Sequence, residues 1–221
     1  MFDDIAGRYD LLNRVLSLGL DRRWRVEAVR LGLTGSRQDI LDVATGTGDV
    51  AFELRRNAPA AQITGLDFSE GMLVLAARKG NRLGADISFV AGDAQALPFT
   101  DASFDLVTIA YGLRNLADPQ KGLAEFQRVL RPGGRLVVLE FPPPPQGIWG
   151  ALVRFYFRRV LPVIGGLVSG SRSAYTYLPT SVEGFMAPRA LTGSMLQAGF
   201  VTVRHRMQSF GLSAVHVADK A

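Results

Sequence analysis

Residues 39–49, Asp39-Ile40-Leu41-Asp42-Val43-Ala44-Thr45-Gly46-Thr47-Gly48-Asp49, carry the strongest indication of the fold in this chain. Its first five residues predict a buried strand, and the residues from Thr47 to about Asn57 have a helical pattern. Gly46 and Gly48 in the turn between them let the backbone approach a ligand closely. The free N–H groups at the start of the helix point at the same place. The stretch therefore predicts a strand, a glycine loop and a helix that hold a ligand at the carboxyl end of the strand.

Strands and helices alternate along the chain around this stretch. Short apolar runs predict the strands, and apolar residues at helical spacing predict the helices between them. Such alternation indicates a parallel sheet with helices on both faces. The expected strands after the first are residues 62–67, 87–91, 104–110 and 135–141, with a turn at 131–134. Asp21 and Ser69 are expected helix N-caps, and Met72, Leu73, Ala76 and Ala77 are expected on one face of the helix after Ser69. Asp118-Pro119 is expected to start a helix to about Leu130, with proline in the first turn.

The pattern changes at Pro142–Pro145. An apolar, helical stretch is expected from about Ile148 to Ser169, a further helix at 190–198, and an antiparallel hairpin of strands at 201–207 and 213–217 at the sheet edge. We expect one domain, because 221 residues suit a single α/β unit. Its parts are a helical cap at 1–34, a cofactor-binding core at 35–141, an apolar insert at 142–199 and a closing hairpin at 200–221.

Composition excludes several classes of protein. The chain has no cysteine, which excludes disulfides, thiolate metal sites and a cysteine nucleophile, and its two histidines disfavour a histidine metal site. The acidic start, Met1-Phe2-Asp3-Asp4-Ile5, is unlike a signal peptide, so a cytoplasmic protein is expected. Residues 151–206 hold seven arginines and one acidic residue. This basic excess favours an anionic partner or membrane surface, and an ordinary solvated face is the alternative.

The glycine loop by itself leaves two cofactor classes open, because Gly46-x-Gly48-x-x-Ala51 also fits a dinucleotide loop. Asp42 and Asp49 flank it and would repel a pyrophosphate, whereas they would attract the ammonium and sulfonium of S-adenosyl-L-methionine. The alternative is that Asp42 only ties down the loop and Asp49 only caps the helix. The candidate cofactor contacts here are Asp42, Ala44, Gly46, Thr47 and Gly48.

Further acids follow at the ends of the next two strands. Asp67 can accept the hydroxyls of a ribose, and Asp93 can accept a hydrogen bond from an adenine amino group, unless it only stabilises its own turn. Phe68 and Met72 are candidates to lie along the adenosine, with plain helix packing as the alternative for Met72. Three strand-end acids in order, Asp42, Asp67 and Asp93, make a stronger signal than any one of them.

Several longer motifs carry a family resemblance. They are Phe2–Asn13, Leu18–Arg25, Leu41–Asp49, Tyr111-Gly112-Leu113-Arg114-Asn115, Leu130–Phe141 and Tyr177–Val182. With them the chain resembles class I methyltransferases, and within these the ubiquinone/menaquinone biosynthesis C-methyltransferases. The resemblance implies a Rossmann-like, seven-stranded, mostly parallel sheet with a reversed C-terminal hairpin. It also implies cofactor contacts at Thr47, Asp67, Asp93 and Ala94, and methylation of a ring carbon of a polyprenylated quinol.

Two departures from the relatives accompany this resemblance. The chain starts almost on the first motif, so an N-terminal lid is expected to be shorter. Ala110 stands where some relatives have serine, so a cofactor contact there has to use the backbone. Demethylmenaquinol is the favoured substrate, and a methoxy-polyprenyl-benzoquinol stays open because both need the same chemistry.

That chemistry suggests catalytic candidates. A quinol carbon becomes nucleophilic when a neighbouring hydroxyl is deprotonated, so the oxyanion needs stabilisation. Arg114 is a poor general base and is expected to stabilise the oxyanion and orient a water, with Asn115 fixing the ring or the cofactor. The alternative for Arg114 is a structural pair with a nearby acid. Tyr9 could reach the reacting ring from the first helix, or be a core aromatic, while His216 is expected to be a satisfied strand histidine.

The insert offers an apolar surface for the prenyl tail. Its charges and helix breakers argue against a membrane span and favour a helix that lies on the bilayer interface, at the inner face of the membrane, or that lines a lipid groove. The alternatives are a cap on the core and a homodimer contact. Rival functions are methylation of another small lipid or phenol, a nucleic-acid methyltransferase and a non-catalytic lipid-binding module. The segment at 111–115 lacks the Asn/Asp-Pro-Pro-aromatic pattern that stacks a flipped base, so no nucleic-acid substrate is expected.

Overall fold

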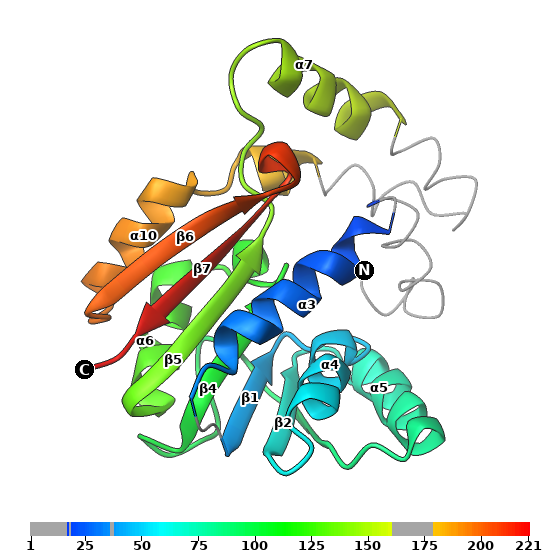
Figure 1. The fold of residues 1–221 in the computed structure, drawn as a ribbon, viewed down its shortest axis with the longest axis vertical. Coiled ribbons are helices and arrows are strands. Elements are labelled where there is room, and N and C mark those ends of the chain that lie inside the picture. The colour runs from blue at the N-terminus through cyan, green and yellow to red at the C-terminus, as the bar shows by residue number, and fades with distance from the viewer. Residues whose placement is uncertain (1–16, 18, 36–37, 161–178) are drawn as a thin grey trace.

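A seven-stranded sheet organises the computed structural model, which describes residues 17, 19–35, 38–160 and 179–221 (Figure 1). The strand order is β3-β2-β1-β4-β5-β7-β6. Neighbours from β3 to β5 pair in parallel, whereas β7 is antiparallel to both β5 and β6. The strands are β1 Asp39–Val43, β2 Gln62–Asp67, β3 Ser88–Ala91, β4 Phe104–Ala110, β5 Leu130–Glu140, β6 Thr202–Gln208 and β7 Ser213–Asp219. The mostly parallel sheet with a closing antiparallel hairpin is confirmed.

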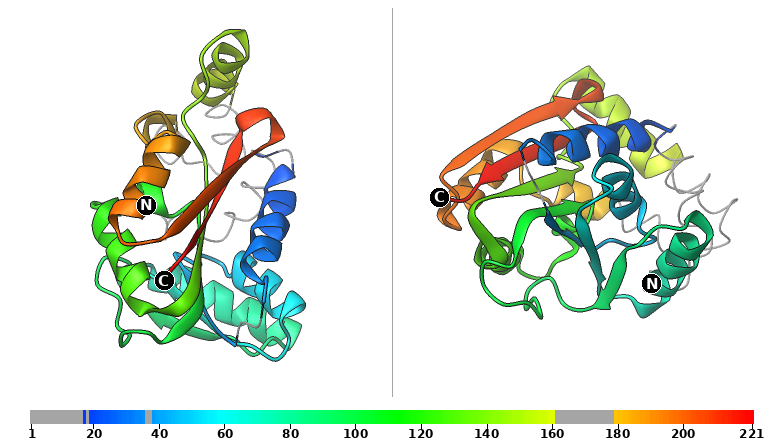
Figure 2. Two further views of the ribbon diagram at one scale, coloured as in Figure 1. Left: turned by 60° about the vertical axis from the view of Figure 1, so that its left-hand side comes forward. Right: turned by 60° about the horizontal axis from the view of Figure 1, so that its bottom comes forward.

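Helices cover both faces of the sheet because strand residues alternate between two cores. On one face, Leu106 and Val137 pack with α3 Leu20–Gly32 and α4 Asp49–Asn57. On the other face, Val107 and Val138 pack with α6 Pro119–Val129 and α10 Pro188–Gln197. Figure 2 shows these helix layers on either side of the strands. The remaining elements are α5 Glu70–Leu83, α7 Ile148–Phe155, η2 Leu113–Asn115, the π-helical η3 Tyr156–Val160 and η4 Ser209–Gly211.

The predicted N-cap Ser69 is confirmed, and the helix predicted to start at Asp118-Pro119 is α6, with Asp118 as its N-cap. The Ser69 hydroxyl accepts from the N–H of Met72, and the Asp118 carboxylate accepts from those of Gln120 and Lys121. The predicted Asp21 cap is wrong, because Gly19 is the N-cap of α3 at φ 76°. Asp21 lies in the first turn instead, where it pairs with Arg25. Its negative charge there interacts favourably with the positive end of the helix dipole.

Two local predictions are wrong. The predicted turn at 131–134 lies inside β5 as an irregularity, since the pairing moves from Phe104–Leu130 to Leu106–Arg135. Ala77, expected on the buried face of α5, is exposed, while Met72, Leu73 and Ala76 are buried. The first predicted helix, with Tyr9, and residues 161–178 of the insert lie outside the described residues.

No helix in the described part of the chain is both long and apolar enough to cross a bilayer.

Candidate active site

The carboxyl ends of β1, β2 and β4 meet at one edge of the sheet, with the glycine loop of residues 44–48 between β1 and α4. Ala44 and Tyr111, which follow β1 and β4, have left-handed φ values of 51° and 58°. Residues with a Cβ adopt this strained region rarely, and such residues gather at functional sites. The loops after β1 and β4 are therefore the candidate site.

These two loops pack directly on each other. A Cβ built on Gly112 would lie 2.6 Å from the Cβ of Ala44, so only glycine allows this approach. The contact places Arg114 and Asn115 of η2 beside the glycine loop, as predicted from the sequence.

Asp67 joins the glycine loop to the start of α5. Its Oδ2 accepts from the N–H of Gly46 at 2.7 Å, and its Oδ1 accepts from the N–H of Ser69 at 2.9 Å. A Cβ built on Gly46 would meet no atom of the described residues within 4 Å, so no described side chain covers this point of the loop. The carboxylate thus lies at the mouth of the loop, where the ribose contact predicted for it stays a prediction.

Asp42 lies beneath the loop, not on its surface. Its side chain is buried, with Oδ1 accepting from the Thr108 hydroxyl and Oδ2 from the Thr45 hydroxyl, both at 2.6 Å. Burial raises the pKa of Asp42 to about 6, although the two hydroxyl donors lower it and the charge of Asp67 adds a smaller rise. This arrangement supports the structural alternative, in which Asp42 ties down the loop, and its cofactor contact stays a prediction.

The raised pKa of Asp42 predicts a particular pH dependence of stability. The folded state holds a proton on Asp42 in a pH range where the unfolded chain has lost it, so this group's contribution falls as the pH rises. Relative to Asp42→Asn, wild type should lose about 2 kcal/mol in free energy of unfolding between about pH 4.5 and about pH 7.5. Urea unfolding of both proteins at the two pH values measures this difference.

The comparison with Asp42→Asn isolates this group. Burial lowers the pKa of His216 to about 4, which gives a slope of the opposite sign, but His216 is present in both proteins and cancels. A difference between the two proteins that stays constant with pH would contradict the raised pKa of Asp42.

The structure supports neither role that the sequence suggested for Asp49, which were to attract the positive groups of the cofactor and to cap the helix. It does not cap α4, whose N-cap is Gly48 without a side-chain hydrogen bond. Its carboxylate pairs with Arg25 at 2.9 Å and with Lys79. Because two cations offset its charge, Asp49 contributes little to a preference for a sulfonium over a pyrophosphate.

The third strand-end acid, Asp93, holds its own turn. Its Oδ1 accepts from the N–H of Gln95 at 2.8 Å, and Gln95 Oε1 accepts from the N–H of Asp118. Ala94 is buried against the core of α6. The turn thus fixes residues 93–95 beside the end of β3, and contacts of Asp93 and Ala94 with a cofactor stay predictions.

The two candidates to lie along the adenosine, Phe68 and Met72, differ in their exposure to solvent. Phe68 is 83% exposed just after β2, whereas Met72 is 2% exposed and packs in α5. The structure therefore leaves Phe68 available to a ligand and supports helix packing for Met72. Thr47 is buried within the loop, and Ala110 is partly buried at the end of β4.

Arg114 forms a buried pair with Glu140 at the end of β5. The Nη1 group donates to Glu140 Oε1 at 2.7 Å and to the Tyr111 carbonyl oxygen at 2.5 Å, and the guanidinium lies 5.6 Å from the Phe141 ring centre. The side chains are 8% and 2% exposed. The predicted alternative, a structural pair with a nearby acid, is therefore present. Within the described residues, however, Arg114 Nε is buried without a hydrogen-bond partner.

Glu140 is a residue that the sequence reasoning missed. It also accepts from the N–H groups of Arg114 and Phe141, so it organises the whole turn after β4. The available signal was its position, because Glu140 ends the fifth strand as Asp42 and Asp67 end or nearly end the first two. Phe141 follows it and stacks on Tyr111 with ring centres 4.5 Å apart. Burial raises the pKa of Tyr111, so its phenol stays protonated.

The remaining candidates lie apart from this cluster or outside the description. The Asn115 amide donates to the Tyr111 carbonyl at 3.3 Å. His216 is buried on β7, where Nε2 donates to the Pro188 carbonyl at 3.0 Å. Its Nδ1 is buried without a hydrogen-bond partner among the described residues, so the expected satisfied strand histidine is confirmed only in part. Tyr9 lies outside the described residues.

Comparison with known proteins identifies the family. The model of the ubiE/COQ5 methyltransferase family matches residues 1–220. A Thermus thermophilus protein named demethylmenaquinone methyltransferase is 56% identical over 220 residues, covering all of both chains. The chain belongs to the ubiE/COQ5 methyltransferase family.

Other relatives agree with this assignment. A Geobacter sulfurreducens ubiquinone/menaquinone biosynthesis C-methyltransferase is 48% identical, covering all of this chain and 87% of the relative. Among solved structures, a SAM-dependent methyltransferase from Thermotoga maritima has a TM-score of 0.72 at 19% identity, covering 100% of this chain and 98% of that one. At that identity the likeness supports the fold alone.

As a ubiE/COQ5 methyltransferase, the chain is an S-adenosylmethionine-dependent enzyme, and its loop suits that cofactor. The uncovered Gly46 gives a ligand close access to the backbone, and the Asp67 carboxylate beside it can accept hydroxyl hydrogens. Phe68 offers an exposed ring next to Asp67. Bound there, S-adenosylmethionine would supply an electrophilic methyl group, and Gly46, Asp67 and Phe68 are the candidates that would hold it.

Proposed function

We propose that this chain methylates a ring carbon of demethylmenaquinol to give menaquinol. The observation that carries the proposal is full-length identity of 56% to the Thermus thermophilus demethylmenaquinone methyltransferase. A Deinococcus radiodurans protein of the same name is also 56% identical and covers all of this chain. The intact glycine loop with Asp67 at its mouth supports an active enzyme over a non-catalytic scaffold.

In this proposal Arg114 stabilises the oxygen of the deprotonated quinol. A hydroxyl proton must leave before the neighbouring ring carbon becomes nucleophilic, and the negative charge that develops requires a preorganised donor. Glu140 and the Tyr111 carbonyl hold Nη1, while the buried Nε has no described partner and is a donor that a substrate oxygen can use. Glu140 is then a positioning residue that acts through Arg114.

Two further residues complete the proposed site. Asn115 is held by the Tyr111 carbonyl and lies in the same turn, so it can fix the ring or the cofactor. Tyr9 lies outside the described residues, the sequence predicts it in an opening helix, and we propose that it meets the reacting ring. The enzyme must also align the ring carbon with the methyl group, because such alignment supplies much of the rate of group transfer.

The prenyl tail requires an apolar surface, and we propose that α7 provides it. Ile148, Trp149, Leu152 and Phe155 are large apolar side chains on α7 that remain 41–92% exposed. Such side chains suit an acyl or prenyl environment better than water. We accordingly place the enzyme at the inner face of the membrane as a peripheral protein, with a homodimer contact through α7 as the competing arrangement.

Quinones extracted from cells that lack the protein test this function. Mass spectrometry should find demethylmenaquinone accumulated and menaquinone lost, with recovery on expression of the wild-type chain. Accumulation of an unmethylated benzoquinone instead would favour the ubiquinone branch named for the Geobacter relative. Unchanged methylation of both quinones would refute the proposal.

A further inference from the structure

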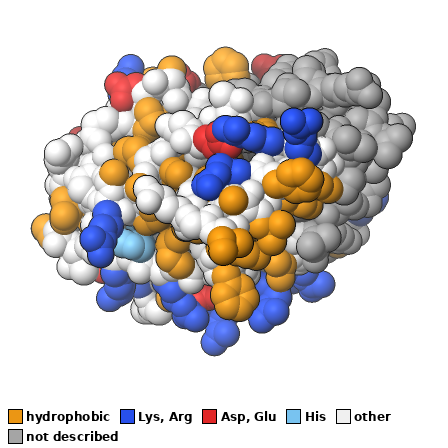
Figure 3. All heavy atoms as spheres, turned by 90° about the horizontal axis from the view of Figure 1, so that it is seen from above, with side chains coloured by type: hydrophobic (Ala, Val, Ile, Leu, Met, Phe, Trp, Pro, Cys, Tyr) orange, Lys and Arg blue, Asp and Glu red, His pale blue; other side chains and the backbone are white. Residues whose placement is uncertain are grey.

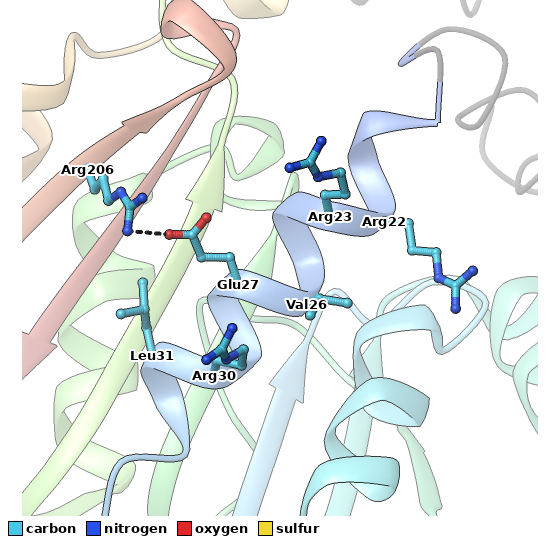
Figure 4. Close-up of a pocket in the computed structure, with 7 residues that line it drawn as sticks. All are labelled: Arg22, Arg23, Val26, Glu27, Arg30, Leu31 and Arg206. Atoms are coloured by element: carbon cyan, nitrogen blue, oxygen red, sulfur yellow. Dashed lines mark ion pairs between the residues drawn. The ribbon is translucent and has the colours of Figure 1, made fainter.

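A shallow basin of arginines lies along the outer side of α3. It has a volume of about 750 Å³ and is lined by Arg22, Arg23 and Arg30 of α3 and by Arg206 of β6, with Glu27 among them. Figure 4 shows these side chains along one stretch of α3, with Arg206 reaching toward it from the neighbouring strand. The basin lies between α3 and β6, and none of its residues forms part of the proposed methyl-transfer site.

The basin keeps a positive charge after its internal pairing is counted. Glu27 Oε1 accepts from Arg206 at 2.8 Å, and Glu27 Oε2 accepts from the Gln208 amide at 3.2 Å. Arg22, Arg23 and Arg30 are exposed, and none of them forms an ion pair with another residue of the described chain. Three cations are therefore left over for an anionic partner.

An apolar rim adjoins the basin at the end of η4. The Trp24 indole N–H of α3 donates to the Ser209 hydroxyl at 2.8 Å, which holds η4 against the basin's helix. The next residue, Phe210, is 91% exposed and has a left-handed φ of 57°. A bulky side chain in that strained conformation costs free energy, and the exposed Phe210 ring gains no burial against the described residues that would offset this cost.

The rim continues onto α7. The Trp149 indole N–H donates to the Phe210 carbonyl at 2.9 Å, and the two rings lie 6.4 Å apart. Ile148, Leu152 and Phe155 recur at helical spacing and are all more than half exposed. Figure 3 shows hydrophobic side chains gathered on this end of the molecule, with arginine and lysine side chains around them.

We infer that the chain docks on an anionic phospholipid surface through this rim and basin, with Phe210 and α7 entering the interface and Arg22, Arg23 and Arg30 meeting lipid phosphates. The inference deepens the proposed function and rests on it, since a polyprenylated quinol is a bilayer substrate. An apolar face beside a row of cations is the arrangement that binds anionic membranes. A nucleic acid would use the cations but would leave exposed Ile148 and Phe210 without a role, so lipid is the better occupant.

Vesicle sedimentation of the full chain tests this docking. Wild type should bind vesicles of phosphatidylcholine with phosphatidylglycerol, bind pure phosphatidylcholine vesicles much less, and be released by salt. The Arg23→Gln/Arg30→Gln variant should partition about 25-fold more weakly into anionic vesicles, at roughly five-fold for each charge. The matched control, Arg78→Gln/Arg82→Gln, removes two exposed arginines of α5 near the opposite edge of the sheet and should bind like wild type.

A second variant and a second assay distinguish failure of the docking inference from failure of the proposed function. Phe210→Ser should also weaken vesicle binding, although it removes no arginine charge. Methylation of a short-tailed quinol in solution should be unchanged in Arg23→Gln/Arg30→Gln, whereas failure of wild type in that assay would refute the proposed function alone. Equal vesicle binding by wild type and Arg23→Gln/Arg30→Gln would overturn the docking inference. Binding of duplex RNA without binding of anionic vesicles would overturn it in favour of a nucleic acid.

Discussion

Arg114→Ala is expected to lower kcat for quinol methylation by about 100- to 1,000-fold while S-adenosylmethionine still binds. This is the range for removal of one preorganised donor to an oxyanion. The loss should fall on kcat because the charge on the quinol oxygen develops as its proton leaves. Turnover with a short-tailed demethylmenaquinol, together with calorimetric binding of the cofactor, measures both quantities.

Arg114→Lys is the matched control for this substitution. Lysine keeps a cation opposite Glu140 but lacks the Nε–H and the planar fork of arginine. Its kcat should lie between those of wild type and Arg114→Ala, with the fold retained. If both variants turn over quinol at the wild-type rate with cofactor bound, Arg114 only holds the loop.

Glu140→Ala is expected to lower the free energy of unfolding by about 3–5 kcal/mol, the usual effect of breaking a buried ion pair by removing one partner. The guanidinium of Arg114 would stay buried without its carboxylate, and the N–H of Phe141 would lose its acceptor. Urea unfolding at neutral pH measures the loss.

The double variant Arg114→Met/Glu140→Ala separates charge burial from packing. It removes both charges, so it should be more stable than Glu140→Ala alone although it is inactive. A loss below about 1 kcal/mol in Glu140→Ala would show that the pair behaves like an exposed one.

The sequence predicted the strands better than the side-chain roles. Buried parallel strands are continuous apolar runs with turn residues at their ends, so 39–43, 62–67 and 104–110 match the structure residue for residue. The irregularity in β5 was missed because Arg131-Pro132-Gly133-Gly134 has the composition of a turn. Its place inside a strand depends on pairing with Phe104 and Leu106, which are distant in sequence.

The roles of the acids could be predicted only in part, for a similar reason. The strand-end position of Asp42 and Asp67 is visible in the chain, but the partners that define their roles come from other elements. Asp42 is engaged by Thr108 of β4, and Asp49 by Arg25 of α3 and by Lys79 of α5. The pairing of Arg114 with Glu140 likewise joins the ends of β4 and β5, so the sequence could name an acidic partner as an alternative but not locate it.

Transfer of a methyl group from S-adenosylmethionine to a ring carbon of a quinol is the activity proposed for this chain. Its most direct test is incubation of the purified protein with demethylmenaquinol and cofactor that carries an isotopically labelled methyl group, followed by mass spectrometry and NMR of the product. The expected product is menaquinol with the label on the ring carbon. Bound cofactor without labelled quinol, or a label on the quinol oxygen, would contradict it.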